Sequence, residues 1–569
     1  MRRNGRRGGQ RARSRRARSA ISDTDAGRGP ADLIITDAAV YTVDAARRWA
    51  DSVAIRGDRI LRVGSDADVR DLRGRRTEVY SLPGRMVVPG FQDAHCHPPQ
   101  SGRNLLRVNL EEAQDLRGYG EIISAYARAH PAERWIIGGG WSMNSFPGGN
   151  PRKEELDAIV PDRPVFLVNR DMHGAWLNSL ALQVAGITRD TPDPWDGRIE
   201  RDPATGEPSG TLHEGAAYSF VHHLPPVRQE EWEEAIREAQ GHLHSLGITS
   251  WQDAWVTPET LRAYRTLAER RELTGRVVAS LWWDRHRGQE QLDELLAERE
   301  WGTFGRLRAT TVKIMVDGVP ENCTAAMLEP YLDALGRWTR NSGTSFVERE
   351  ALLSAVERLD HARFQVHFHA IGDRAIRDAL DAIERAQRSN GRRDARHHIA
   401  HLQVIHPDDV PRFRQLGVIA NVQPLWACME PQMEKLTLPF IGPERASWQY
   451  RFGDLHRSGA TVAFGSDWAV STANPLLEME VAVTRVDPEA RENEPLLPEQ
   501  RLDLPTAIAA FTMGSASVNT NELETGSIEV GKLADLVVID RNLFAEDAGP
   551  IGEAQVEMTL VGGRLVHQR

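Results

Sequence analysis

The sequence predicts an α/β fold in which a (β/α)8 TIM-type barrel carries a small β-sandwich domain composed from both termini and a large insertion after barrel strand 1. Eight apolar runs lie in the middle of the chain, and amphipathic segments separate several of them. This alternation is typical of βα units and a parallel sheet. Short alternating strands at both ends of the chain predict the sandwich.

We therefore expect four regions along the chain. They are an Arg-rich disordered tail over 1–30, an N-terminal sandwich segment over 31–88, the barrel over 89–515 with its insertion at about 100–245, and a C-terminal sandwich segment over 516–569. A chain of 569 residues is too long for one ordinary core, which agrees with this division.

Composition limits the function classes. Hydrophobic residues make up 40% and charged residues 27%, as in ordinary globular proteins. No apolar stretch approaches the roughly 18 residues that span a bilayer, so no membrane partner is expected. Cys96, Cys323 and Cys428 are too few and too scattered for a disulfide framework, and a cytoplasmic location is expected.

The first eighteen residues are half arginine and contain no acid, although the whole chain has a net charge of -11. Such a segment has too few apolar residues to form a hydrophobic core, so we expect it to be disordered. No apolar run follows the arginines, so a twin-arginine export signal is not expected. One interpretation of this tail is a tether to nucleic acid. We favour the other interpretation, a tail without a function of its own.

The sandwich strands come first and last along the chain. ADLIITDAAVYTVD, DSVAIRGDRILRVG and TEVYSL show short alternating strands separated by turn residues. GSIEVGKLADLVVID and MTLVGGRLVHQR repeat this character at the far end. Two distant halves of the same kind predict one β-domain, with the middle of the chain inserted into it.

The eight barrel strands are expected at MVVPGFQDAHCH, GITSWQDAW, RVVASLWW, TVKIMVDG, FQVHFHAIGD, RHHIAHLQ, GVIANVQP and TVAFGSDW. Helical segments such as EEWEEAIREAQGHLHSLG and REALLSAVERLDHAR lie between several of them, with early acids and an apolar stripe. The segment between the first two strands is too long for one helix. We expect it to form a lid or a substrate-binding subdomain.

Polar residues end several of these strands. Because strand side chains alternate, His95 and His97 point the same way and can reach one metal ion, while Cys96 faces away. Barrel enzymes keep their chemistry at these carboxy-terminal ends. The other candidates are Lys313, His367, His369, His397, His398, His401 and Asp467. Alternation does not choose between His367 and His369, or between His397 and His401.

Each candidate alone also has an ordinary structural explanation, since a strand lysine can reach water and an aspartate after Gly-Ser can cap a turn. Their joint position at the ends of separate strands favours one site. Unpaired charge in a barrel interior is costly, and a divalent metal would compensate it.

From about residue 32 onward, the chain resembles a known family. PGFQDAHCH, the Lys313 strand, HAIGD, RHHIAH and FGSDW, in this order, resemble the amidohydrolase superfamily. WIIGGGW, DMHGAWLNSLAL, GEPSGTLHE and LADLVVID are similar to its amidohydrolase 3 branch, which includes the YtcJ-like proteins and the N-substituted formamide deformylases. The chain departs at Ala400, where the branch commonly has glutamate.

The resemblance implies a centre of one or two divalent ions, expected to be zinc. His95 and His97 would hold one ion, His369 and His401 the other, and Asp467 would touch the metal and the hydrolytic water. Lys313 matches the lysine that many binuclear members carry as a carboxylated, bridging ligand. An unmodified ammonium has no lone pair and cannot bind metal.

The implied activity is hydrolysis of a non-peptide carbon–nitrogen bond in a small-molecule amide, such as an N-substituted formamide or an N-acyl amine. A metal-activated water would attack, with Asp467 as general base. The predicted substrate contacts, in segments similar to the branch, are Trp141, Asp171, His173, Trp176 and Asn178. Glu214 either caps a helix or reaches the site, and the sequence favours neither.

Two alternatives remain open. Deamination or cyclic-amide hydrolysis would keep the fold and change the product. A non-catalytic scaffold that binds acidic partners through the basic tail belongs to another class, and the complete ligand set argues against it. The sequence leaves open whether the protein forms a homodimer.

Overall fold

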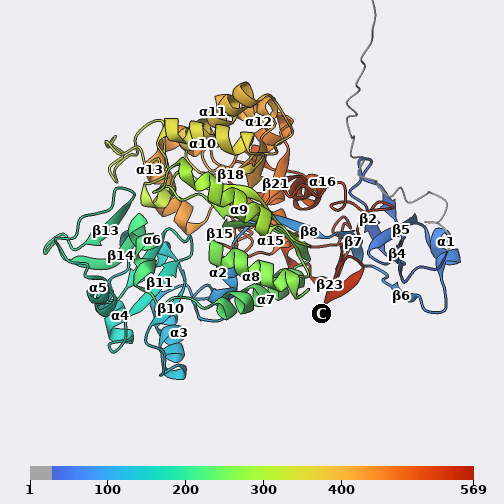
Figure 1. Ribbon diagram of the computed structural model, residues 1–569, viewed down its shortest axis with the longest axis horizontal. Coiled ribbons are helices and arrows are strands. Elements are labelled where there is room, and N and C mark those ends of the chain that lie inside the picture. Colours follow the sequence, from blue (N-terminus) through green and yellow to red (C-terminus); the bar gives the residue numbers. More distant parts are fainter. Residues whose placement is uncertain (1–28) are drawn as a thin grey trace, which may run out of the picture.

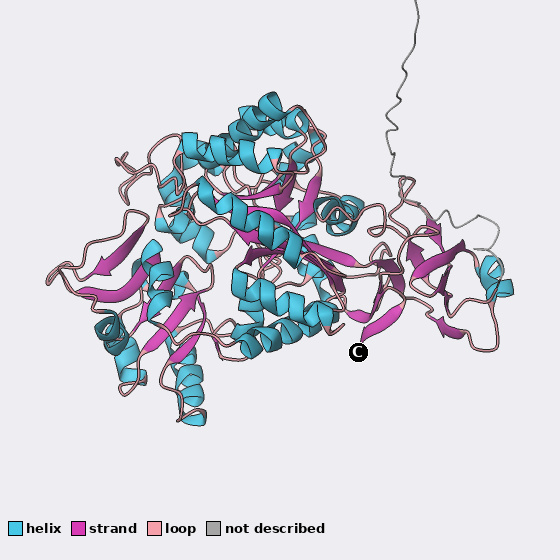
Figure 2. Cartoon of the chain, viewed as in Figure 1, coloured by secondary structure: helices cyan, strands magenta, loops and turns pink. Residues whose placement is uncertain are grey.

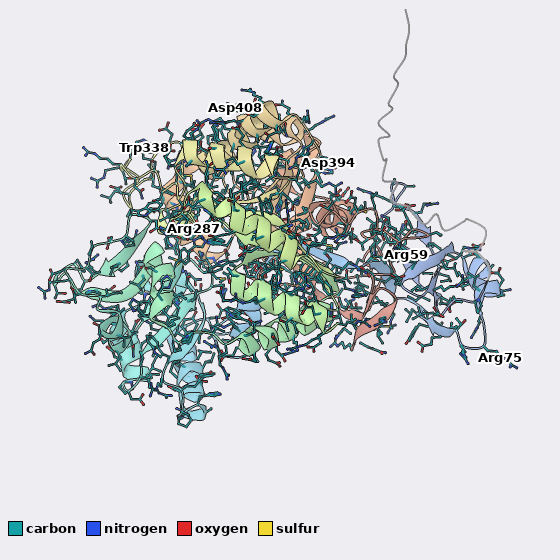
Figure 3. All side chains as sticks on the ribbon, viewed as in Figure 1. Arg59, Arg75, Arg287, Trp338, Asp394 and Asp408 are labelled. Atoms are coloured by element: carbon teal, nitrogen blue, oxygen red, sulfur yellow. The ribbon has the colours of Figure 1, made fainter. Side chains whose placement is uncertain are left out.

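The structure is a computed structural model, and it describes residues 29–569. The disorder and the tether function considered for the first eighteen residues lie outside this range. Figures 1 and 2 show a central barrel with helices around it, a β-domain on one side and the insertion on the other. Charged side chains such as Arg59, Arg287 and Asp408 project from the surface (Figure 3).

The TIM-type barrel is confirmed. Its eight strands pair in the order β21-β20-β19-β18-β17-β16-β15-β8, and each of these pairings is parallel. The strands are β8 Phe91–Cys96, β15 Ile248–Val256, β16 Arg276–Trp282, β17 Leu307–Met315, β18 Gln365–Ala370, β19 His398–His401, β20 Ile419–Val422 and β21 Val462–Phe464.

The first and last strands meet at the carboxy-terminal end of the barrel. The Asp467 amide donates to the His95 carbonyl at 2.7 Å, and the His97 amide donates to the Trp468 carbonyl at 2.7 Å. The segment after β21 is therefore fastened to β8 at the residues that the sequence singled out.

One strand prediction is corrected. MVVPGFQDAHCH was expected to be a single barrel strand, but it forms two strands that belong to different sheets. β7 Met86–Pro89 pairs with β22 Leu536–Ile539 and with β2 Ala39–Tyr41 in the β-domain. The chain passes from one sheet to the other at Gly90, which packs so closely on Thr249 that an added Cβ would lie 2.4 Å from its hydroxyl.

Helices cover the outside of the barrel. They include α7 Gln229–Ser245, α8 Pro258–Glu269, α9 Leu292–Gly302, α10 Arg349–His361, α11 Asp373–Asn390, α12 Val410–Leu416, α14 Phe452–Arg457, α15 Pro475–Thr484 and α16 Leu504–Ala509. α11 buries Ile376, Leu380 and Ile383, which share one face at helical spacing. Each such side chain stabilises the fold by roughly 1.5–3 kcal/mol.

Both ends of the described chain contribute to the β-domain. One sheet has the order β5-β4-β1-β6, and the other has the order β24-β23-β22-β7-β2-β3. The remaining strands of these sheets are β1 Leu33–Thr36, β3 Trp49–Ala50, β4 Ser52–Arg56, β5 Arg59–Gly64, β6 Glu78–Ser81, β23 Val556–Val561 and β24 Arg564–Gln568. Val53, Val87 and Val538, from three segments, share one buried cluster.

The insertion is built on its own sheet, in the order β13-β14-β12-β11-β10-β9. Its elements are β9 Val108–Asn109, α3 Leu116–Ala129, β10 Ile136–Trp141, α4 Lys153–Ile159, β11 Val165–Asn169, β12 Gly174–Leu177, α5 Ser179–Ala185, β13 Gly197–Arg201, β14 Pro208–Glu214 and α6 Gly215–Phe220. α2 Pro98–Leu105 leads into it from β8.

Within residues 29–569, no helix combines the length and the hydropathy needed to cross a bilayer.

Candidate metal centre and active site

The structure brings the strand-end residues together at the carboxy-terminal mouth of the barrel. Asp467 Oδ1 lies 3.2 Å from His95 Nε2 and 2.9 Å from His97 Nε2. Its other oxygen lies 3.8 Å from His401 Nδ1. The rings of His369 and His401 are 4.4 Å apart between centroids. Residues from β8, β18, β19 and the segment after β21 therefore share one buried space.

Asp93 holds the first and last strands in register beneath this space. Its Oδ1 accepts hydrogen bonds from the His95 amide at 2.9 Å and the Ser466 amide at 3.1 Å. Its Oδ2 accepts from the Ser466 hydroxyl at 2.5 Å. Cys96 faces away, toward the Gln252 carbonyl. Asp93 therefore orients its neighbours through their backbones.

The histidines that alternation left open occupy different environments. His367 Nε2 is 2.7 Å from His95 Nδ1, and its Nδ1 is 3.1 Å from the Ser280 hydroxyl, so both of its ring nitrogens are engaged. His397 pairs with Asp360 at 3.2 Å and accepts from the Val366 amide.

His369 and His401 differ from these residues. Both ring nitrogens of each lack a hydrogen-bond partner among the described residues, although the side chains are 5% and 2% exposed. Buried polar atoms are normally paired, and atoms left over suggest a missing ligand.

The donor chemistry fits a divalent cation. One nitrogen each from His95 and His401 and one Asp467 oxygen lie within 4.8 Å of one another. Burial lowers the pKa of His95, His369 and His401 well below the ordinary value, so their imidazoles are neutral and offer lone pairs. Asp467 Oδ1 faces the Nε2 atoms of both His95 and His97.

Asp467 is ionised in this setting. Burial alone would raise its pKa, but the hydrogen bond with His97 and the charges of neighbouring groups bring it below the ordinary value. Its backbone has φ 55°, and that of His401 has φ 78°. Such left-handed conformations cost non-glycine residues of order 1–3 kcal/mol and cluster at functional sites.

Lys313, on β17, reaches the same space. Its Nζ is 3.5 Å from His95 Nε2, the residue is 3% exposed, and no carboxylate of the described chain forms an ion pair with it. Burial lowers the pKa of this amine to about 7. A sizeable neutral fraction therefore exists at neutral pH, and a neutral amine is the form that can react with carbon dioxide.

The insertion contributes a histidine. His173 lies 5.4 Å from His369 between ring centroids, and its Nδ1 is 2.8 Å from Glu214 Oε2. Glu214 Oε1 also accepts from the Thr324 hydroxyl at 2.7 Å. Glu214 stands at the N-cap position of α6 but makes no side-chain cap bond, and it contacts the site through His173 without lining either cavity.

This pair is charged. Burial alone would lower the pKa of His173 and raise that of Glu214. Their mutual attraction outweighs burial, raising the pKa of His173 and lowering that of Glu214 to about 2. His173 Nε2 makes no hydrogen bond within the part of the chain that the structure describes.

Three predicted substrate contacts are corrected. Trp141, Trp176 and Asn178 are fully buried inside the insertion and line neither cavity at the centre. The Trp141 indole donates to the Leu167 carbonyl at 2.8 Å. Asn178 caps α5 by accepting from the Ala181 amide at 3.0 Å. Asp171 and His173, by contrast, line both cavities.

The sequence reasoning missed two aspartates. Asp317 accepts from the Ile371 and Gly372 amides and lies 3.3 Å from His369 Nδ1, so it helps to place β18 and its histidine. Asp253 lies in the second half of β15, fully buried, with one oxygen unpaired among residues 29–569. The sequence carried a signal for each. Asp317 follows Lys313 by four residues, so both side chains point to the same side of the expected strand. Asp253 stands in QDAW as Asp93 stands in FQDAH.

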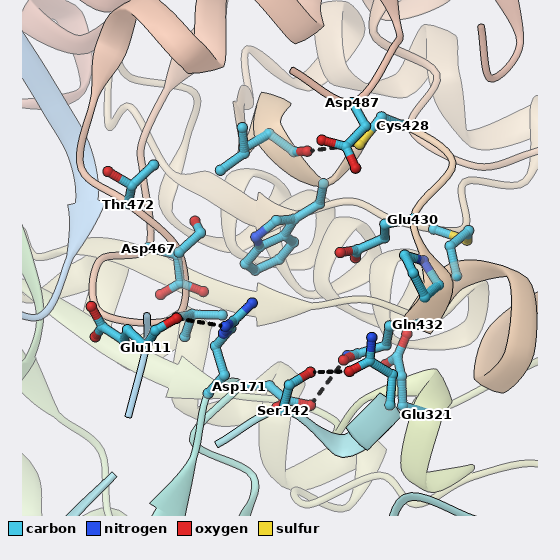
Figure 4. Close-up of a pocket in the computed structure, with 18 of the residues that line it drawn as sticks. Glu111, Ser142, Asp171, Glu321, Cys428, Glu430, Gln432, Asp467, Thr472 and Asp487 are labelled. Carbon is cyan, nitrogen blue, oxygen red and sulfur yellow. Dashed lines mark hydrogen bonds between the residues drawn. The ribbon is translucent and has the colours of Figure 1, made fainter. Parts of the chain in front are cut away.

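Two cavities meet at this centre. One has a volume of ≈ 800 Å³ and the other of ≈ 550 Å³. Both are lined by His369, His401 and Asp467 together with Asp171 and His173. Figure 4 shows the larger one, with Asp467 on its wall.

Comparisons with known proteins agree with this geometry. Protein LONG AFTER FAR-RED 3 of Arabidopsis thaliana is 31% identical over 94% of this chain and 92% of its own length. The N-substituted formamide deformylase of Arthrobacter pascens is 28% identical over 95% and 98%. A crystal structure of an uncharacterized metal-dependent hydrolase from Pyrococcus furiosus matches with a TM-score of 0.69 and 27% identity, over 90% of this chain and 99% of its own.

The family model described as the amidohydrolase family matches residues 78–567. This range contains the barrel, the insertion and the strand-end cluster. The resemblance noted from the sequence motifs, including that to the amidohydrolase 3 branch, is thereby confirmed. The chain belongs to the amidohydrolase family.

Proposed function

We propose that this protein is a metal-dependent hydrolase of a carbon–nitrogen bond other than a peptide bond, acting on a small-molecule amide. The observation that carries the proposal is the buried cluster of His95, His401 and Asp467, whose donor atoms lie within 4.8 Å of one another at the barrel mouth. The formamide deformylase relative supports an N-substituted formamide or an N-acyl amine as the substrate class.

His95, His97, His369, His401 and Asp467 would hold one or two divalent ions, for which zinc is our proposal. Lys313 would join them as a carboxylated side chain, because its buried amine has a pKa of about 7. When bound, the cation lowers the pKa of a water molecule and polarises the scissile carbonyl.

The protein's own groups would perform the remaining steps. Asp467 would accept the proton of the attacking water and deliver it to the leaving nitrogen, which requires an ionised carboxylate at the start. His173, fixed by Glu214, would donate a hydrogen bond from Nε2 to the developing oxyanion. His367 would keep His95 oriented through the bond between their ring nitrogens.

The test is an amine-release assay over N-formyl, N-acetyl and longer N-acyl amides, with zinc or manganese. The wild-type enzyme should release amine from one acyl class, lose activity when a chelator removes the metal and regain it with zinc. Asp467→Asn should reduce kcat by about 10²–10⁴-fold. Circular dichroism is the check that this variant keeps its fold.

Separate readouts distinguish the parts of the proposal. Native mass spectrometry should show a carbon dioxide adduct that is absent in Lys313→Met. Ammonia released in place of an alkyl or aryl amine would support the deaminase alternative. A fully active Asp467→Asn enzyme would show that Asp467 is not the general base.

A further inference from the structure

Besides Asp467 and the exposed Glu489, the larger cavity is lined by carboxylates from five separate segments. They are Glu111, Asp171, Glu321, Glu430 and Asp487. Figure 4 labels all five around the cavity, together with Asp467. Among the described residues that line it, Arg170 is the only lysine or arginine. Its guanidinium donates to the backbone carbonyl of Glu111 at 3.1 Å.

Within residues 29–569, none of these five carboxylates forms an ion pair, whereas carboxylates on the protein surface commonly do. Asp171 Oδ1 accepts from the side-chain Nδ2 of Asn169 at 2.9 Å, and Glu321 accepts from the Thr437 hydroxyl. Glu430 has neither a hydrogen bond nor an ion pair to its side chain in the described chain. A recessed carboxylate without a cation is costly, so this cavity favours a positively charged group.

The pKa values reflect this imbalance. Burial first, and then the negative charge of neighbouring carboxylates, raise the pKa of Glu321 and of Glu430 to about 7. A bound cation would reverse both effects by favouring the ionised forms.

The cavity opens directly on the reacting centre. His369, which is 5% exposed and makes no hydrogen bond through Nε2 among residues 29–569, lines it, and so do His401 and Asp467. A molecule placed for attack at this centre can therefore extend one end toward Glu321 and Glu430.

A second metal-ion site does not explain the carboxylates. Within residues 29–569, His95, His401 and Asp467 form the one group of three or more potential ligands whose atoms lie within 4.8 Å of one another. The five carboxylates are too dispersed to surround one ion. A flexible organic cation can contact them without that requirement.

The smaller cavity has a different character. Tyr218, Trp255 and Trp282 line it, with the two tryptophan rings 5.4 Å apart and the tyrosine ring 6.4 Å from Trp255. Its arginine, Arg285, is already paired with Asp196 at 2.6 Å. This cavity therefore suits an apolar or aromatic group.

The geometry points to a substrate amide with a positively charged group on one side of the scissile bond and an apolar, aromatic group on the other. The charged end, an ammonium or a guanidinium, lies in the larger cavity against Glu430 and Glu321. This inference rests on the proposed amide hydrolysis and adds the substrate class.

The first experiment compares matched amides. N-phenylacetyl-1,4-diaminobutane carries the cation on the amine side, and 5-aminopentanoyl benzylamide carries it on the acyl side. Each is paired with the neutral analogue that has methyl in place of the amino group. One cationic amide should exceed its neutral partner at least tenfold in kcat/KM.

Two substitutions localise the preference. Glu430→Gln should reduce the ratio of cationic to neutral kcat/KM to below threefold. Glu434→Gln is the matched control, because this exposed residue lies four positions further along the same segment and lines neither cavity. It should keep the wild-type ratio. Neutral amides turned over as fast as both cationic ones would overturn this inference and leave the proposed hydrolysis intact.

Binding measured by calorimetry tests the site without turnover. 4-Phenylbutylammonium should bind the zinc-loaded enzyme at least tenfold more tightly than 4-phenylbutanol, and Glu430→Gln should abolish the difference. If the ammonium binds in this way but no amide is hydrolysed, the proposed function fails and the cation site stands. Equal affinity for both ligands, or calcium binding that Glu430→Gln removes, would overturn the site.

Discussion

Removal of the Asp93 carboxylate should loosen the metal centre without touching a ligand side chain. Asp93 accepts three hydrogen bonds, from the His95 amide, the Ser466 amide and the Ser466 hydroxyl. Asp93→Ala leaves three buried donors unpaired, at about 1–3 kcal/mol each. The variant regains roughly 3 kcal/mol because it no longer buries a carboxylate whose pKa is raised to about 6. The expected net loss of stability is about 3 kcal/mol.

Asp93→Asn should behave differently. The amide oxygen still accepts from the two backbone amides, and the Ser466 hydroxyl can turn to accept from the new NH2 group, so we expect a loss within about 1 kcal/mol. Cys96→Ala is the control, because this neighbouring side chain points away from the centre.

Three measurements check the Asp93 series. Thermal melting should rank Asp93→Ala well below Asp93→Asn and the wild type, and bound zinc per chain should fall in the same order. Displacing His95 and Asp467 by even 1 Å should reduce kcat/KM by about 10²-fold in Asp93→Ala. Melting and zinc content equal to the wild type in Asp93→Ala would show that Asp93 does not hold the metal centre in place.

Two further predictions concern the charged pairs. Glu214→Gln replaces a charge-assisted hydrogen bond to His173 by a neutral one of about half the strength, so kcat/KM should fall about fivefold. An unchanged kcat/KM would show that the His173–Glu214 pair does not contribute to catalysis. Asp360, paired with His397 and Arg393, has a pKa lowered to about 2, because its hydrogen bonds to His397 and Asn390 outweigh the effect of burial. Its stabilising effect is fully present above the ordinary pKa of 3.8 and is lost as pH falls through 2. Asp360→Asn should therefore cost about 1–2 kcal/mol at pH 7 and much less near pH 2, as followed by urea unfolding at both pH values.

The barrel was predictable because periodicity is local. Each of the eight apolar runs overlaps a barrel strand. His95 and His97 both face Asp467 while Cys96 faces the Gln252 carbonyl, as alternation predicts. The division of MVVPGFQDAHCH between two sheets was not predictable. Both halves are buried on all sides, and only their pairing partners differ.

The fold class, the family and most of the strand-end residues at the centre follow from the sequence alone, although Asp253 and Asp317 were missed. Which of these residues face each other depends on the packing of distant segments. His367 and His369 share one strand face, so alternation treats them alike. Lateral contacts engage both ring nitrogens of His367, with His95 and Ser280. Among residues 29–569 they leave Nε2 of His369 without a hydrogen bond.

The cavity walls also needed the tertiary structure. Glu321, in a short 3-10 turn, and Glu430, in a loop, are far apart in the chain, and no local pattern indicates that both line one cavity with Asp171 of the insertion. Conversely, Trp141 and Asn178 lie in segments that resemble the branch, yet packing and capping use them inside the insertion. Local pattern sets which face of an element a residue occupies, and only packing between distant segments sets what that face meets.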